Sequence, residues 1–275
     1  MSLGPFDLTG GPFLILYGCL FILAVAASLI IPRRLRPEGR WREVTDLDQL
    51  AWLAGGRARF ADALVARMLA GRALKLTGRN LFSMDRREAA ATPAERSLLA
   101  LEPPVRWSAI SRTLRDYAEP LERKLEQQGL VMTRGQQRDI AFWATLPLLM
   151  LLAFGATKWV VGDLRERPIG FLTAALIVTA LLAIARYFTV DRRTKAGLAA
   201  LDAARTGKSR LRRAPTTPEI GLAVALFGTA ALAGSPFEPF HKERTGGGDG
   251  GGGGGGDGGG SGCGGGGGCG GCGGG

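Results

Sequence analysis

Two long apolar runs in the middle of the chain constrain its fold more than any other feature. They cover residues 140–161 and 169–188 and are joined by the six residues 163–168, four of which are charged. Crossing a bilayer core takes about 20 helical residues, and a helix satisfies its own backbone hydrogen bonds in lipid. Residues 140–157 and 169–185 contain no charged side chain. The sequence therefore predicts two antiparallel transmembrane helices joined by a short outer loop.

A third apolar run lies near the start of the chain. Residues 11–31 are uncharged and are followed at once by Arg33, Arg34 and Arg36, whereas residues 1–10 contain no Lys or Arg. A cleaved signal peptide begins with basic residues and has a shorter apolar region, so we expect a retained helix rather than a cleaved leader. Because cytoplasmic flanks are enriched in Lys and Arg, this helix should run from an extracytoplasmic N-terminus into the cytoplasm.

The charges that flank the apolar pair predict the same orientation. The outer loop is neutral, whereas residues 189–216 hold eight basic and two acidic residues. Both ends of the pair should therefore lie in the cytoplasm. Basic side chains at that surface attract anionic lipid headgroups. We expect this contact for Arg33, Arg34, Arg36, Arg192, Arg193, Lys195, Arg210, Arg212 and Arg213.

Residues 32–139 have the mixed polarity of a folded cytoplasmic domain. Residues 46–54 and 57–70 are expected to form two helices that are separated by the glycine pair Gly55-Gly56. In the second segment, apolar side chains recur at helical spacing.

A β-hairpin and two further helices are expected in the same domain. Alternating apolar residues surround the turn-forming residues 77–80. Thr92 and the proline after it are typical of a helix start. A longer helix over 108–128 should kink or divide at Pro120. Together these elements predict a small, winged-helix-like α+β domain attached to a mainly α-helical membrane protein.

The net charge of +11 and the pI near 10.2 also raise the question of nucleic acid. A recognition helix should present clustered basic and amide side chains on one face, but Arg59, Arg67 and Arg72 are scattered. We therefore expect a solvated surface or one that docks an unidentified protein partner. A membrane-tethered nucleic-acid-binding regulator is the less favoured alternative.

Residues 220–234 form an apolar segment of ambiguous kind. The run between Glu219 and Glu238 is uncharged but rich in alanine and glycine. It is short for a crossing, yet small residues suit close helix packing in lipid. A fourth crossing, a buried helix and a segment lying on the membrane all remain open.

The tail, residues 246–275, is almost entirely glycine and is expected to be a flexible coil. Its thiols Cys263, Cys269 and Cys272, with His241 upstream, are ligand types that suit Zn²⁺ or Cu(I). Only one half of a paired-cysteine site is present, because Cys269 and Cys272 have no second pair. A metal site, free thiols open to redox chemistry and a simple spacer are the three alternatives.

No catalytic constellation is recognisable in the sequence. His241 is the only histidine, and it stands beside the glycine tail, where a positioned base is not expected. We therefore expect no enzyme and no bound cofactor, but a scaffold or interaction protein. The alternative is a redox or metal-handling membrane protein that acts through the tail cysteines.

The chain resembles a family of uncharacterised bacterial multi-pass membrane proteins. The residues that carry the resemblance are the stretch 50–56, Leu-Ala-Trp-Leu-Ala-Gly-Gly, the apolar pair, the stretch 219–228 and the cysteine-bearing glycine tail. These proteins share a domain of unassigned role and carry a variable Gly/Cys-rich tail. The resemblance implies a protein of the bacterial inner membrane and supplies no catalytic residues to transfer.

Overall fold

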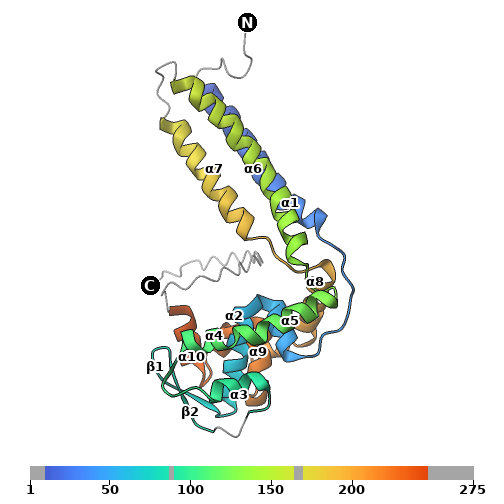
Figure 1. The fold of residues 1–275 in the computed structure, drawn as a ribbon, viewed down its shortest axis with the longest axis vertical. Coiled ribbons are helices and arrows are strands. Elements are labelled where there is room, and N and C mark those ends of the chain that lie inside the picture. Colours follow the sequence, from blue (N-terminus) through green and yellow to red (C-terminus); the bar gives the residue numbers. More distant parts are fainter. Residues whose placement is uncertain (1–9, 87–89, 164–169, 247–275) are drawn as a thin grey trace, which may run out of the picture.

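Three long helices form a stalk that projects from a head of shorter helices and a small sheet (Figure 1). The structure, a computed structural model, describes residues 10–86, 90–163 and 170–246. The predicted flexible tail therefore lies outside the described residues, as does nearly all of the outer loop and of the N-terminal segment. The stalk consists of α1 (Gly10–Leu35), α6 (Arg134–Asp163) and α7 (Gly170–Phe188).

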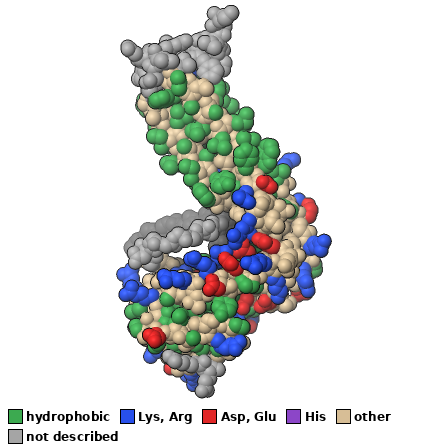
Figure 2. Space-filling view, in the orientation of Figure 1, with side chains coloured by type: hydrophobic (Ala, Val, Ile, Leu, Met, Phe, Trp, Pro, Cys, Tyr) green, Lys and Arg blue, Asp and Glu red, His purple; other side chains and the backbone are tan. Residues whose placement is uncertain are grey.

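Each stalk helix is long and apolar enough to cross a membrane, which confirms the three predicted spans at the level of length and composition. Within the described residues, the large apolar side chains that are exposed all belong to these helices, apart from Trp41. Figure 2 shows the same division between an apolar stalk and a head of mixed charge. Such an apolar surface is stable in lipid rather than in water.

Helix α6 is the central helix of the stalk because α1 and α7 both pack against it. A Cβ atom at Gly155 would lie 2.7 Å from Leu176 and 2.8 Å from Tyr17, so glycine allows both neighbours to approach closely. The hydroxyl groups of Tyr17 and Thr179 are 2.9 Å apart and join α1 to α7.

A proline in α1 creates a polar contact with α7. Pro32 has no N–H, so the carbonyl of Ser28 lacks its usual partner four residues later in the helix. Arg186 of α7 supplies the missing donors, with Nε at 3.1 Å and Nη2 at 3.0 Å from that carbonyl oxygen. The guanidinium group therefore replaces a helical hydrogen bond and fastens the two helices near the head.

We expect Arg186→Leu to destabilise the stalk by about 1–3 kcal/mol, because it leaves the Ser28 carbonyl unpaired. The loss should shrink by about 1 kcal/mol in a Pro32→Ala background, where the helix regains its own donor. Thermal unfolding of the four variants of this cycle in detergent measures both effects. An equal loss in the two backgrounds would contradict the assignment.

The head begins with a helix that is broken where the sequence predicted. Helix α2 (Leu47–Ala70) starts after the capping residue Asp46 and ends at Gly71. Gly55 and Gly56 are non-helical, and Gly56 has a φ of 64°, which favours glycine. The two halves therefore point in different directions and present separate apolar faces to the core.

The expected hairpin is present and is extended by a third strand. Strands β1 (Leu74–Gly78), β2 (Leu81–Met84) and β3 (Val105–Arg106) form an antiparallel sheet in the order β1-β2-β3. The winged-helix identity of the unit stays a prediction. Helix α3 (Pro93–Leu99) starts with a complete capping box between Thr92 and Glu95.

The helix expected over 108–128 is divided, but not at Pro120. Helices α4 (Trp107–Thr113) and α5 (Arg115–Gln127) meet at Leu114, and Pro120 lies inside α5. The proline removes a hydrogen bond only from the carbonyl of Asp116, an exposed residue at the start of α5, where water can replace the lost donor.

The head also contains residues 189–246, which corrects the predicted boundary at residue 139. Buried side chains from both segments form one continuous core. This second segment contains α8 (Lys195–Gly207), η3 (Ser209–Arg212), η4 (Thr217–Glu219), α9 (Ile220–Phe227), η5 (Thr229–Leu232) and α10 (Glu238–Gly246).

Helix α9 settles the ambiguous apolar segment as a buried helix, so a possible fourth crossing is wrong. Eight residues of helix extend over about 12 Å, far less than a bilayer core. Val224, Ala225 and Leu226 are completely buried, and α9 packs against α2. An apolar helix suits the centre of a protein core as well as it suits lipid.

Candidate functional site: an arginine–glutamate cluster at the base of the stalk

A buried carboxylate lies where the head meets the stalk. Glu122 of α5 stands on the same helix face as the buried residues Leu114, Ala118 and Leu125, and its side chain is only 4% exposed. Burying an ionised carboxylate is costly unless the group is paired and hydrogen-bonded. The surroundings of Glu122 must therefore supply cations.

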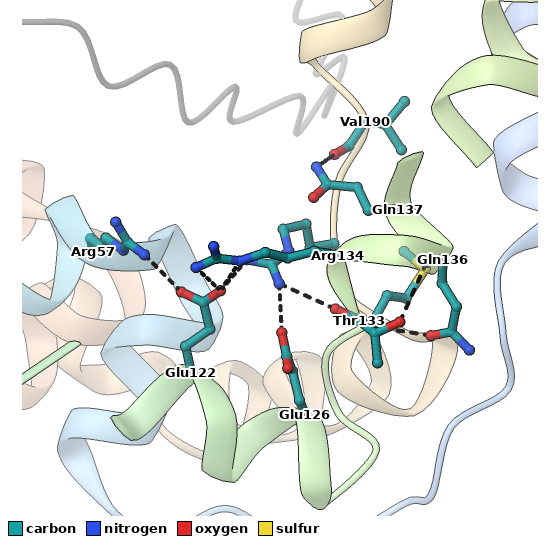
Figure 3. A network of polar contacts seen from close by, with 10 residues as sticks. Arg57, Glu122, Glu126, Thr133, Arg134, Gln136, Gln137 and Val190 are labelled. Atoms are coloured by element: carbon teal, nitrogen blue, oxygen red, sulfur yellow. Dashed lines mark hydrogen bonds and ion pairs between the residues drawn. The ribbon is translucent and has the colours of Figure 1, made fainter. Parts of the chain in front are cut away.

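Three arginines from three different segments supply them (Figure 3). Arg57 follows the break in α2 and donates to Glu122 at 3.1 Å, and Arg134, the first residue of α6, donates at 3.4 Å. Arg192, between α7 and α8, donates at 2.6 Å and also binds Glu126 at 2.7 Å. We call Arg57, Glu122, Glu126, Arg134 and Arg192 the Glu122 cluster.

The electrostatics of this cluster favour the ionised carboxylate. Burial raises the pKa of Glu122, but the hydrogen bonds and charges of Arg192 and Arg57 outweigh burial and hold the pKa below its ordinary value. The cluster contains three guanidinium groups and two carboxylates, so it carries one excess positive charge.

The cluster joins the head to both helices of the membrane hairpin. Arg134 opens α6 and Arg192 follows α7 closely, so the two chain crossings between head and hairpin meet at Glu122. Arg134 lies about 9 Å along the helix axis before Ile140, where the predicted apolar span begins. The cluster therefore lies at headgroup depth if the stalk occupies a bilayer.

Exposed aromatic side chains lie on the stalk just beyond the Glu122 cluster. Phe142 and Trp143 of α6 are about half exposed, and Phe188 at the end of α7 is 73% exposed. Trp and Tyr in particular are enriched at membrane–water interfaces, and Trp143 and the partly exposed Tyr187 are residues of this kind. The base of the stalk thus has an aromatic layer above a basic layer.

Other arginines close the carbonyl ends of helices inside the head. Arg193 donates to the Ala54 carbonyl at 2.8 Å, where Gly55 and Gly56 interrupt α2. Arg205 donates to the Leu226 carbonyl at 3.0 Å, at the end of α9. A cation at the C-terminal end of a helix satisfies its free carbonyls and its dipole. Part of the net positive charge is therefore structural.

These two arginines also border an open cleft of about 350 Å³ along α8. Its wall includes Leu198, Leu201 and Asp202. Both guanidinium groups are hydrogen-bonded to backbone carbonyls. The arginines that border this cleft therefore stabilise the fold.

The nine basic residues expected at the membrane surface fall into two groups. Five of them bind protein groups: Arg36 binds Asp191 at 3.6 Å, Lys195 binds Glu38 at 2.7 Å, Arg210 binds Glu219, and Arg192 and Arg193 make the contacts described above. Arg33, Arg34, Arg212 and Arg213 are exposed. The first pair follows the apolar part of α1 directly and is well placed for lipid contact.

The predicted metal ligands are not brought together in the described part of the chain. His241 lies on α10, with Nδ1 3.1 Å from the hydroxyl of Thr229. Cys263, Cys269 and Cys272 lie outside the described residues. Among the residues that are described, no group of three His, Cys, Asp or Glu side chains could hold a metal ion.

Helix α10 is fastened to the sheet side of the head. Phe240 is buried beside Phe82 and Trp107. The guanidinium group of Arg244 binds Asp62 at 2.7 Å and lies over the ring of Trp107. Burial raises the pKa of Asp62, and Arg244 opposes that shift.

Sequence reasoning missed four members of the cluster, namely Arg57, Glu122, Glu126 and Arg134. One signal was available, because Glu122 interrupts an otherwise apolar helix face four residues after Ala118. Its partners carry no such signal, since Arg57 is 65 residues away in the sequence.

Comparison with protein-family models, with curated proteins and with solved structures finds no match to this chain.

Proposed function

We propose that this chain is a non-enzymatic, multi-pass protein of the bacterial cytoplasmic membrane that holds its head at the cytoplasmic surface as a scaffold for a protein partner. One observation carries the proposal. The head is assembled from segments on both sides of the membrane hairpin, and the Glu122 cluster fastens these segments where they meet the stalk. Such a head is held at a fixed height above the bilayer.

The distribution of charge supports the cytoplasmic orientation. Exposed Arg33 and Arg34 follow the apolar part of α1 at the head end of the stalk. The positive-inside rule favours the cytoplasm for that end. The buried ion pairs of the head join its segments to one another. The outer surface of the head is the surface that we expect to bind a partner.

Orientation is tested with a thiol reagent that does not cross membranes. In a variant whose tail cysteines are serines, we expect Ala203→Cys, an exposed position of α8, to react only after cell lysis. Labelling of intact cells would place the head outside and contradict the proposal.

Scaffolding is tested by placing a photo-crosslinking amino acid at exposed head positions, such as Arg96, Ser108 and Ala203. We expect a discrete protein adduct from at least one face of the head. Val178, which is 55% exposed on the stalk, serves as the matched control and should give no protein adduct. A head surface that captures no protein at any scanned position would refute the scaffold.

A further inference from the structure

We propose that Arg57 and Arg134 form a binding site for the phosphate of an anionic phospholipid headgroup. The proposal rests on the membrane attachment proposed above and names a ligand for the Glu122 cluster. It differs from the general attraction of scattered basic residues to lipid, because it requires a defined pair of side chains.

The first argument is the geometry of the pair. Arg57 binds one oxygen of the Glu122 carboxylate and Arg134 binds the other, so the same buried group holds both guanidinium groups in place. An arginine has five N–H donors and these contacts use few of them. The two side chains therefore form a prearranged pair of forks, which suits the bidentate recognition of phosphate oxygens.

The second argument is exposure. The side chain of Arg57 is 43% exposed and that of Arg134 is 66% exposed, whereas Glu122 beneath them is 4% exposed. The carboxylate is thus shielded and the cations face outward. Because the cluster has one excess positive charge, a monoanionic phosphodiester would neutralise it.

The third argument is position. Arg134 is the first residue of α6, so its guanidinium group lies near the positive end of a 30-residue helix that continues into the stalk. Arg138 is exposed one turn further along α6 and lies on the same face. This path of positive charge leads from the cluster towards the apolar span.

The test uses the full chain purified in a neutral detergent, with lipid binding counted by native mass spectrometry. The probes are phosphatidylglycerol, phosphatidylcholine with the same acyl chains, and inorganic phosphate. We expect saturable binding of phosphatidylglycerol, with affinity about fivefold lower for each arginine removed in Arg57→Gln and Arg134→Gln. Arg96→Gln, an exposed position on α3, is the matched control and should bind as the wild type does.

Each other outcome would overturn the proposal. Unchanged phosphatidylglycerol binding in the variant that carries both Arg57→Gln and Arg134→Gln would show that the lipid binds elsewhere. Equal binding of phosphatidylcholine would show that the site does not distinguish an anionic headgroup from a zwitterionic one. Inorganic phosphate that binds at the same arginines and excludes the lipid would make the ligand a free anion. Arg134→Gln alone leaves Glu122 paired with Arg57 and Arg192, so it provides a folded variant for the comparison. In a detergent micelle both ends of the stalk face the same solution, so an error in the proposed orientation does not affect this test.

Discussion

Replacing Glu122 by glutamine should destabilise the head by about 3 kcal/mol, because it leaves three guanidinium groups around a neutral amide. The estimate is at the lower end for a broken buried ion pair, since Arg57 and Arg134 are partly exposed to water. Chemical unfolding of the purified full chain, followed by tryptophan fluorescence, measures the change.

The same variant should change the response to acid. The folded pKa of Glu122 lies below its ordinary value of 4.5, so its stabilisation is complete above pH 4.5 and is lost as the pH falls through the lowered pKa. The stability difference between wild type and Glu122→Gln should therefore shrink in acid. Burial raises the pKa of Asp48 and of Asp62, but both variants share those groups.

The matched control for this prediction is Glu119→Gln on the same helix. Glu119 is half exposed and its contact with Arg123 is a surface pair at 3.9 Å. Such a pair contributes about 0.5 kcal/mol or less. Equal losses for Glu119 and Glu122 would show that the cluster does not hold the head together.

Leu226→Ala in α9 should cost about 3 kcal/mol of head stability, because it opens a cavity at a completely buried position. Helix α9 packs against α2, so the loss should reach the whole head rather than one helix. The same unfolding experiment measures it.

Leu222→Ala provides the internal control, since Leu222 lies one turn earlier on α9 and is only partly buried. We expect it to cost about 1 kcal/mol, in proportion to the smaller area withdrawn from water. A helix that lay in lipid would respond weakly and equally at both positions. Two small, equal losses would therefore contradict a place for α9 in the core.

The elements that could be predicted are those determined by neighbouring residues. The span lengths follow from uninterrupted apolar runs, the break in α2 follows from Gly55-Gly56, and the start of α3 follows from Thr92. Each of these signals acts over a few residues. Elements that depend on so few neighbouring residues can be predicted from the sequence alone.

The elements that could not be predicted depend on contacts between distant segments. An apolar run such as α9 has the same composition in a protein core as in a membrane, so only its packing against α2 identifies it. The position of Arg192 beside a span predicts a lipid contact, but its side chain binds Glu122, 70 residues earlier. Charge near a long apolar helix can thus serve the protein's own ion pairs.

The anchoring of α10 has a consequence for the glycine tail. Phe240 and Arg244 attach the last described helix to the head, so the chain continues from the head and not from the far side of the stalk. If the head lies in the cytoplasm, as we propose, glutathione and thioredoxin would keep Cys263, Cys269 and Cys272 reduced. The redox state of the compartment, rather than the sequence of the tail, would then keep these cysteines as free thiols instead of disulfides.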